Sequence, residues 1–441
     1  MKPYIVVQGP VATRSGYGNH TRDLVLALIK SDKYNIEIIS LPWGHCPMDA
    51  LKSDNPEHVE IQKHIARKNI TQQPDVFIQI SVPNEFKKVG KYNIGITAGI
   101  ETTIVSHDFL QGSNNMDLIV TTSEHSKKGF LDSVYDKIDE KTKQKTGDLR
   151  LTTPIKVLFE GVDLNVYKKI DTIQDKVSTE LKDIKDDFCY LFVGHWLKGN
   201  VGQDRKDVGM MLKTFCEAFK RKSPRNRPGL ILKCSHATFS ISDKTAIIDK
   251  IQSVLSPYDI NDIPNIYLLH GDLSDDEMNS LYNHPKVKAM ISFTKGEGFG
   301  RPLAEFARTG KPVIASKWSG QLDFLHEDYC MLLPGELTQV HSSASDQFIL
   351  RDSKWFTVNY AYAAKILLDV MTNYKQYLAK SRKMPQYIKD NFSLIKMNDL
   401  FINLVDEGLK VVPTAVKLKL PELNKKTDNK IKLPELKKVS V

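Results

Sequence analysis

The sequence predicts an α/β protein in which two doubly wound units follow one another along the chain. Three observations lead to this fold class. Short runs rich in Val and Ile alternate with longer helical patterns, the series occurs twice, and a polar stretch separates the two series at Tyr167–Asp187. With 441 residues, 41% of them hydrophobic, the chain is long and apolar enough for two packed cores.

The first series, residues 1–170, predicts an N-terminal domain around a parallel sheet. Its expected strands are bounded by Gly, Pro or Asn, and they are Tyr4–Gln8, Asn35–Leu41, Asp75–Ser81, Tyr92–Ile96 and Asp117–Thr122. Helical patterns lie between the strands, as at His20–Lys30 and Pro56–Lys68. The strongly polar insertion Lys137–Leu149 predicts a mobile surface loop.

The second series, residues 171–412, predicts a C-terminal domain of the same type with closing helices at its end. Its expected strands are Cys189–Val193, Gly229–Lys233, Asn265–Leu269, Val287–Phe293 and Pro312–Ser316. Its expected helices are Lys206–Lys220, Ser242–Leu255, Ser274–Tyr282 and Pro302–Thr309.

Residues 413–441 differ in composition and predict a basic tail. Eight Lys against three acids give this segment a charge of +5 out of the net +9 of the chain. The remaining residues carry only +4, so their net charge does not predict binding to a polyanion such as nucleic acid. The sequence Lys-Leu-Pro-Glu-Leu occurs twice, at Lys419–Leu423 and at Lys432–Leu436. The pattern favours a flexible tail or a strap over the other domain, with a partner-docking peptide as the alternative.

Membrane, secretory and metal-binding classes are not indicated by the sequence. No apolar run approaches the length of a membrane span, and Met1, Lys2 and Pro3 lead directly into a strand-like segment. We therefore expect a cytoplasmic protein. The five Cys are scattered without a CxxC pair, which indicates neither a disulfide framework nor a zinc site.

The segment Lys295–Glu305, with the sequence Lys-Gly-Glu-Gly-Phe-Gly-Arg-Pro-Leu-Ala-Glu, carries the strongest functional signal. It follows an apolar strand and leads into a helix expected to open at Pro302. Its glycines let the backbone approach a ligand closely, and exposed amides at a helix start attract phosphate. The acids Glu297 and Glu305 suit the hydroxyls of a sugar and a ribose. A plain strand–turn–helix would explain Glu297 only in part and the glycines poorly.

This segment resembles the E-x7-E signature of the retaining GT-B glycosyltransferases of family 4, the glycogen-synthase-like group. Other pieces resemble motifs of that family and follow in its order: Phe159–Asp163 with Tyr167, Tyr190–Gly194 with Arg205, Lys206 and Asp207, His270–Leu273, and Lys311–Ala315 with Ser319 and Gly320. The resemblance implies a GT-B fold, in which two Rossmann-like domains face each other across a cleft. The chain also looks like the glycosyltransferases of tailed phages.

The resemblance implies donor-binding roles for the loop of the second domain. Glu305 would bind the ribose of the nucleotide, and Glu297 would hold the hydroxyls of the donor sugar. The backbone amides of Gly298, Phe299 and Gly300 would contact the sugar and the diphosphate. The helix start at Arg301 would also stabilise the charge of the diphosphate.

Two cations complete the implied catalytic group. Lys206 would neutralise the diphosphate and aid its departure. The family places an arginine directly after the glycine of the preceding strand, whereas this sequence has His195 there. Arg205 is therefore the candidate for the second diphosphate ligand, with a solvated charge at a helix start as the alternative.

The first domain supplies candidates for the acceptor side and for the far side of the donor. The loop Gly9–Asn19 resembles the N-terminal glycine loop of the family, which makes Gly16 and Gly18 candidate donor contacts. Arg14 is either a further contact on the acceptor side or a surface arginine. Glu101 follows the fourth strand and His125 the fifth, at the edge where such sheets bind ligands. Either residue could serve the acceptor or have a structural role.

The resulting hypothesis is transfer of a hexose from a nucleotide-sugar donor, with UDP-glucose as the first choice, to a hydroxyl acceptor. The resemblance implies retention of configuration, and we expect no metal and no cofactor because no strand-end DxD motif is present. The acceptor could be a saccharide, a protein, a lipid carrier or modified DNA. Alternatives are an epimerase or phosphorylase of the same fold, a phage-type enzyme that glycosylates hydroxymethylated bases in the host cytoplasm, and a non-catalytic sugar- or nucleic-acid-binding protein.

Overall fold

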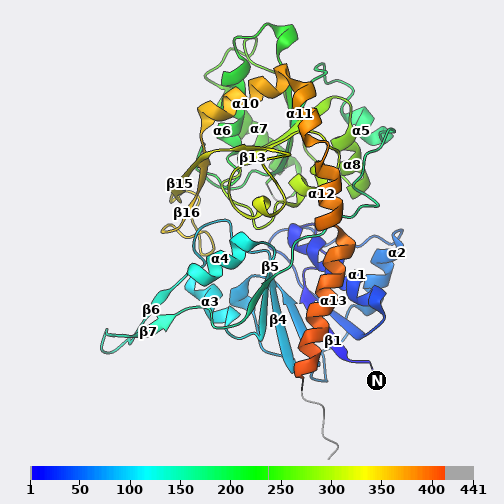
Figure 1. Cartoon of the computed structure of the whole chain (residues 1–441), viewed down its shortest axis with the longest axis vertical. Helices are drawn as coiled ribbons and strands as arrows, with labels where there is room; N and C mark the ends of the chain where they lie inside the picture. Colours follow the sequence, from blue (N-terminus) through cyan, green and yellow to red (C-terminus); the bar gives the residue numbers. More distant parts are fainter. Residues whose placement is uncertain (1, 237, 413–441) are drawn as a thin grey trace, which may run out of the picture.

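Two α/β units lie one above the other, and each contains a six-stranded sheet flanked by helices (Figure 1). The computed structural model describes residues 2–236 and 238–412. The predicted basic tail, 413–441, lies outside the described residues. All strand pairs within the two large sheets are parallel, which confirms the predicted doubly wound α/β class.

The first sheet has the strand order β2-β1-β3-β4-β5-β8. Its strands are β1 (Tyr4–Gly9), β2 (Asn35–Ser40), β3 (Val76–Ile80), β4 (Tyr92–Thr97), β5 (Leu118–Thr121) and β8 (Ile155–Val157). The helices around it are α1 (Gly16–Ser31), α2 (Pro56–His64), the short η1 (Pro83–Glu85), α3 (His107–Ser113) and α4 (Glu124–Asp132). All five predicted strands of this unit are present.

The second sheet has the order β11-β10-β9-β12-β13-β14, the arrangement of a dinucleotide-binding Rossmann sheet. Its strands are β9 (Cys189–His195), β10 (Gly229–Ser235), β11 (Ile266–Leu269), β12 (Val287–Ser292), β13 (Val313–Ser316) and β14 (Met331–Leu333). Its helices are α5 (Asp175–Glu180), α6 (Val208–Phe219), η2 (Pro224–Asn226), α7 (Ile241–Leu255), α8 (Asp275–Asn283), α9 (Arg301–Ala307), η3 (Gly320–Asp323), α10 (Tyr360–Thr372), α11 (Tyr374–Ser381) and α12 (Met384–Asn391). A separate antiparallel hairpin pairs β15 (Gly335–Gln339) with β16 (Lys354–Val358).

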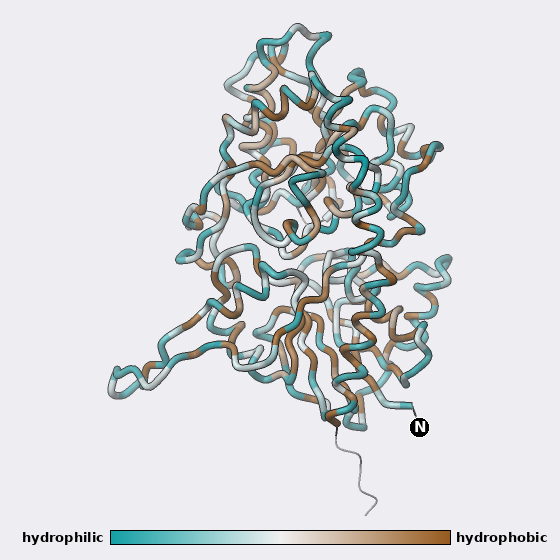
Figure 2. Tube along the Cα trace, viewed as in Figure 1, coloured by the Kyte–Doolittle hydropathy of each residue, from teal (hydrophilic) through white to brown (hydrophobic). Residues whose placement is uncertain are grey.

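The cores follow from the composition of the strands. A parallel sheet covered on both faces reads as a continuous apolar run, and all five residues of β3 (Val-Phe-Ile-Gln-Ile) are buried. Figure 2 shows the same pattern, with hydrophobic colour along the strands of both sheets and hydrophilic colour over much of the outer loops. The apolar side chains of the two units gather into separate clusters.

The last helix, α13 (Leu394–Val411), returns from the second unit to the first and runs along its sheet (Figure 1). Its apolar face, which includes Met397, Phe401 and Val405, belongs to the same buried cluster as Ile5 of β1. The range 171–412 predicted for the second domain therefore has to be corrected, because its last helix packs on the first domain.

The polar insertion Lys137–Leu149 was predicted to be a loop, and this prediction is wrong. Tyr135–Ile138 (β6) and Lys145–Leu149 (β7) pair as an antiparallel hairpin that projects from the first unit (Figure 1). Most residues of both strands are exposed. The hairpin thus lacks the alternation of buried and exposed residues by which a strand is normally recognised.

Two helices differ from the predicted bounds in ways that matter for the site. The helix α1 begins at Gly16, where the Ser15 side chain accepts a hydrogen bond from the Gly18 amide, so Gly16 and Gly18 lie in the helix and not in a loop before it. The helix α6 begins only at Val208 rather than at Lys206. Asp207 precedes it in a left-handed conformation with φ 53°, so Lys206 belongs to the loop.

Candidate active site

The switch point of the second sheet, where the chain turns from one direction of strand order to the other, lies between β9 and β12. The loop after β9 carries Arg205 and Lys206, and the loop after β12 carries Glu297. The Lys295 amide donates to the Arg205 carbonyl oxygen at 2.7 Å, which joins the two loops directly. The carboxyl edge of the sheet therefore brings together the three residues predicted to be catalytic.

Glu297 lies between two cations. Its Oε1 forms an ion pair with Lys206 Nζ, and Arg205 Nη1 lies 3.4 Å from its Oε2. Arg205 Nη1 also lies 3.5 Å from Oε1 of Glu101, which belongs to the first domain. The Glu297 residue is only 8% exposed, so these charges interact in a poorly solvated place where electrostatic effects are strong.

The protonation states of this group follow from burial and pairing. Burial raises the pKa of Glu297, but Lys206 and Arg205 outweigh it and hold the pKa below its ordinary value. Burial lowers the pKa of Lys206, and the opposing attraction of Glu297 does not fully restore it. Burial also works against the charge of Arg205, yet Glu101 and Glu297 raise its pKa. The group thus contains two cations and two carboxylates within one contact network.

Glu305, the predicted ribose ligand, is paired inside the protein. Its Oε1 accepts from Arg301 Nε at 2.9 Å and its Oε2 from the Tyr282 hydroxyl at 3.3 Å. Arg301 Nη1 also donates to Oδ2 of Asp23 in α1 at 2.7 Å. Since α1 belongs to the first domain, Arg301 bridges the two domains.

A further acid, Glu160, lies near this bridge. It is 7% exposed, and no hydrogen bond or ion pair of its side chain is found in the part of the chain that the structure describes. Burial, opposed by Arg301 and supported by Asp23 and Glu297, raises the pKa of Glu160 to about 7. Burial likewise raises the pKa of Glu305 to about 7, with Arg301 opposing it. Arg301 therefore contacts two carboxylates, those of Asp23 and Glu305, and its charge also acts on Glu160. The pKa values of Glu160 and Glu305 are both about 7.

The glycine loop packs tightly against the first domain. A Cβ on Gly298 would lie 1.9 Å from the Ala98 carbonyl oxygen, so only glycine allows this approach. Gly300 has φ 102° and caps the short helix α9. The Phe299 side chain points away from the loop into the core, where it packs on Phe324. For Gly298, Phe299 and Gly300, the predicted donor contacts can therefore come only from the backbone.

The other predicted residues of the first domain have different surroundings. A Cβ on Gly18 would meet the Thr13 carbonyl oxygen at 2.2 Å, whereas nothing lies within 4 Å of one on Gly16. Arg14 forms ion pairs with Asp49 of its own domain, at 2.8 Å, and with Asp272 of the second domain.

Of the other acceptor-side candidates, Glu101 contacts Arg205 of the catalytic group, whereas His125 does not join that group. His125 packs edge-on against Trp318, with ring centroids 4.5 Å apart, and its Nε2 is buried without a hydrogen-bond partner among the described residues. Burial lowers its pKa to about 4, so the ring is neutral at pH 7. The pKa of His195 is also lowered to about 4, by poor solvation of its ring and then by Lys206 and Arg205, although the residue as a whole is exposed at the end of β9.

Several contacts of the site were not predicted from the sequence. Asp23 and Glu160 reach the site only because distant segments pack together. Glu160 lies within the segment Phe159–Asp163, which resembles a family motif, but the resemblance gave it no role. The pairing of Lys295 with Asp207 has a signal in the sequence, because a lysine stands at the end of an apolar strand where a buried apolar residue would be expected.

Neither a metal cluster nor a membrane helix is found in residues 2–236 and 238–412. No group of three or more His, Cys, Asp or Glu side chains there could hold a metal ion. No helix of these residues is both long and apolar enough to cross a bilayer.

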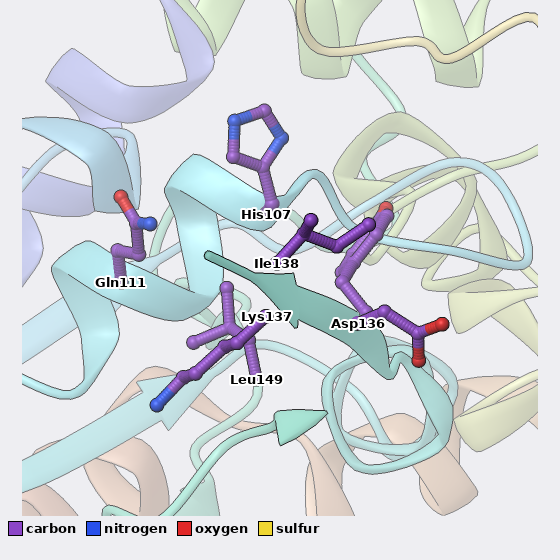
Figure 3. A pocket seen from close by; sticks show the side chains of 7 residues that line it. His107, Gln111, Asp136, Lys137, Ile138 and Leu149 are labelled. Carbon is purple, nitrogen blue, oxygen red and sulfur yellow. The ribbon is translucent and has the colours of Figure 1, made fainter. Parts of the chain in front are cut away.

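A cavity of about 400 Å³ lies apart from the site, between α3 and the β6–β7 hairpin (Figure 3). It is lined by His107, Gln111, Tyr135, Asp136, Lys137, Ile138 and Leu149. None of the predicted site residues lines it.

Comparison with known proteins places the architecture. No protein-family model matches the chain, and no curated protein sequence matches it. Among solved structures, HepE from Anabaena in complex with UDP-glucose superposes with a TM-score of 0.58 at 13% identity, covering 92% of this chain and 100% of that one. Sucrose-phosphate synthase from Thermosynechococcus elongatus has a TM-score of 0.59 at 13% identity, with 92% and 98% covered. A glycosyltransferase from Rickettsia africae has a TM-score of 0.59 at 16% identity, with 93% and 99% covered.

These structures cover 92–93% of the chain, which is more than one sheet alone. Two Rossmann-like sheets are joined here so that the loops at their carboxyl edges touch, as the contacts of Arg205 with Glu101 and of Gly298 with Ala98 demonstrate. The chain has the GT-B fold.

Proposed function

We propose that this protein is a glycosyltransferase that moves a hexose from a nucleotide-sugar donor to a hydroxyl acceptor, with retention of configuration and without a metal. The observation that carries the proposal is the meeting of Lys206, Arg205 and Glu297 at the switch point of the second sheet. Ligands of doubly wound sheets bind at this point. The proposed donor is UDP-glucose, the ligand named for the HepE structure.

The chemistry asked of the site is the departure of a nucleoside diphosphate. The bond between the anomeric carbon and the diphosphate oxygen breaks, and its electron pair goes to that oxygen. Lys206 and Arg205 would offset the developing negative charge in a place where water is largely excluded. Two fixed cations can perform the role that a divalent ion has in other phosphate-transfer sites, which is the basis for proposing a metal-independent reaction.

Glu297 would have a second partner once the donor is bound. When the diphosphate takes over Lys206 and Arg205, the Glu297 carboxylate is released to accept hydrogen bonds from the sugar hydroxyls. Glu305 would bind the ribose in the same way after exchanging its bond with Arg301. The backbone amides of the Gly298–Gly300 loop and the start of α9 would support the diphosphate.

On the acceptor side we favour Glu101 over His125. Glu101 already contacts the catalytic group through Arg205, whereas His125 is packed against Trp318. The acceptor oxygen replaces the diphosphate at the anomeric carbon, and its proton would pass to the diphosphate oxygen that received the electron pair. The class of acceptor is left to experiment.

The test is diphosphate release from UDP-, GDP- and ADP-hexoses in EDTA, with and without acceptors. The acceptors are saccharides, a protein extract, lipid carriers and hydroxymethylated DNA. We expect one donor to be hydrolysed slowly without acceptor, and Lys206→Ala and Glu297→Ala to abolish this release. Lys176→Ala, which removes an exposed lysine of the same domain, is the matched control and should leave release unchanged. A wild-type protein that neither binds nor hydrolyses any donor would leave only a non-catalytic GT-B protein.

A further inference from the structure

The lysine at the start of the glycine loop, Lys295, is buried with its charge. The residue is 1% exposed, and its Nζ lies 3.2 Å from Oδ2 of Asp207, a residue that is 0% exposed. Nζ also donates to Thr357 Oγ1 at 2.9 Å, and the Tyr360 hydroxyl donates to the same Asp207 oxygen at 2.7 Å. The pair therefore joins the loop after β9, the loop after β12 and the start of α10.

Such a pair is not explained by stability. Removing two charges from water costs more than their attraction usually returns, and apolar side chains of similar volume would often be at least as stable. The surroundings of the pair offer too few hydrogen-bond donors, because Asp207 Oδ1 and Asp204 Oδ1 are buried without a hydrogen bond in the described residues. A pair kept at such cost requires another explanation.

The backbone of Asp207 supplies one. Its φ of 53° and ψ of 34° lie in the left-handed region, which few residues other than glycine adopt. This conformation turns the chain between Lys206 and α6, and so it decides where the Lys206 side chain starts. The only side-chain donors to Asp207 in the described residues are Lys295 and Tyr360, so they hold the residue in this conformation.

Lys295 also fixes the other end of the cation pair. Its amide donates to the Arg205 carbonyl oxygen at 2.7 Å, and its carbonyl oxygen accepts from the Phe356 amide at 2.9 Å. One residue therefore holds Arg205 by its backbone and Asp207 by its side chain, with Lys206 between them.

We propose that Lys295 and Asp207 are positioning residues that aim Arg205 and Lys206 at the donor diphosphate. The pair touches neither donor nor acceptor and acts through the two cations. Without the pair, the backbone at Asp207 can relax from the left-handed region, and the ammonium of Lys206 leaves its place beside Glu297. The inference rests on the proposed function, since it assumes that a nucleoside diphosphate is the ligand of these cations.

The test measures the affinity for UDP, GDP and ADP by calorimetry in Lys295→Met, Lys206→Ala and the combination of both. We expect Lys206→Ala to weaken binding of one of them by roughly 10- to 100-fold, as for a lost charged hydrogen bond. Lys295→Met should weaken it about tenfold, and should add less than twofold in the Lys206→Ala background. A merely structural role for Lys295 would add its full effect in both backgrounds.

Two further variants keep the test independent of folding. Lys295→Met combined with Asp207→Asn removes both charges of the pair together, and should fold normally yet still bind the diphosphate about tenfold more weakly. Lys286→Met, which removes a lysine bonded to the Ile184 and Leu181 carbonyl oxygens at the other end of β12, is the matched control and should bind as wild type.

The outcomes separate the two proposals. Suppose that the wild-type protein binds a diphosphate and that Lys295→Met lowers the affinity by the same factor in the wild-type and Lys206→Ala backgrounds. This result would overturn the positioning role alone. Full affinity of the variant that combines Lys295→Met with Asp207→Asn would overturn it as well. If the wild-type protein binds none of the three diphosphates, the proposed function fails and the positioning role fails with it.

Discussion

The bridge from Arg301 to Asp23 predicts that a single side chain of α1 helps to hold the two domains together. Replacing Asp23 by alanine removes a charged hydrogen bond of 2.7 Å between side chains that are 13% and 15% exposed. Arg301 keeps Glu305 as a partner, so the full penalty of an unpaired buried charge does not apply. The loss should be that of one charged hydrogen bond, about 1.5–3 kcal/mol. This corresponds to a roughly 10- to 150-fold shift from the contacting toward the separated arrangement of the domains.

Small-angle X-ray scattering and amide hydrogen exchange measure this shift. We expect Asp23→Ala at pH 8 to increase the radius of gyration and to speed exchange in residues 298–307. The control is Glu57→Ala, which removes an exposed partner of Lys30 within the first domain and should change neither measurement. If Asp23→Ala also leaves scattering and exchange as in wild type, then the Arg301 bridge does not hold the domains in contact.

Three other substitutions give independent checks. Glu160→Gln should raise the thermal midpoint relative to wild type at pH 8 but hardly at pH 5, because ionising Glu160 in the folded state costs stability as pH rises from the ordinary pKa of 4.5 to about 7. The gain is up to about 3 kcal/mol, and parallel pH profiles of the two proteins would contradict it. Glu297→Gln should lower kcat/KM for the donor by roughly 10- to 100-fold while UDP binds at least as tightly, since Lys206 loses a competing partner; weaker UDP binding in calorimetry would argue against this pairing. Gly298→Ala should reduce turnover and speed exchange in the loop around Ala98, because its methyl group would lie 1.9 Å from the Ala98 carbonyl oxygen, and unchanged exchange would refute this.

The strands were predictable because buried strands of a parallel sheet are rich in apolar residues. Strand β3 and its neighbours are mostly apolar runs flanked by turn residues, and they appear within one or two residues of the predicted bounds. The helix α8 was equally clear, since Ser274 and Glu277 form a capping box. The destination of α13 was not predictable, because helical periodicity indicates a buried face but not the sheet that covers it.

The β6–β7 hairpin and the start of α6 were missed for different physical reasons. The hairpin has exposed charged residues on both faces, so no alternation marks its strands. At α6 the sequence Arg205-Lys206-Asp207 has acceptable helix propensity, but Asp207 lies in the left-handed region, where Lys295 and Tyr360 contact its side chain. Tertiary contacts override local preference there.

The members of the site were predictable, whereas their pairing was not. Spacing and resemblance indicated Glu297, Glu305, Lys206 and Arg205, but not that Glu305 is bonded to Arg301 or that Asp23 completes the bridge. The contact of Arg301 with Asp23 joins segments of different domains, and its distance depends on how the domains are oriented. A sequence pattern carries no information on that orientation.

The return of α13 to the first domain has a consequence for synthesis on the ribosome. The N-terminal sheet is complete as soon as its strands have emerged, but the helix that covers one of its faces is translated only after the entire second domain. Until then, apolar residues such as Ile5 lack the partners Phe401 and Val405. The nascent first domain should therefore expose an apolar surface and depend on chaperones through most of translation. A chain that stops before Leu394 should aggregate.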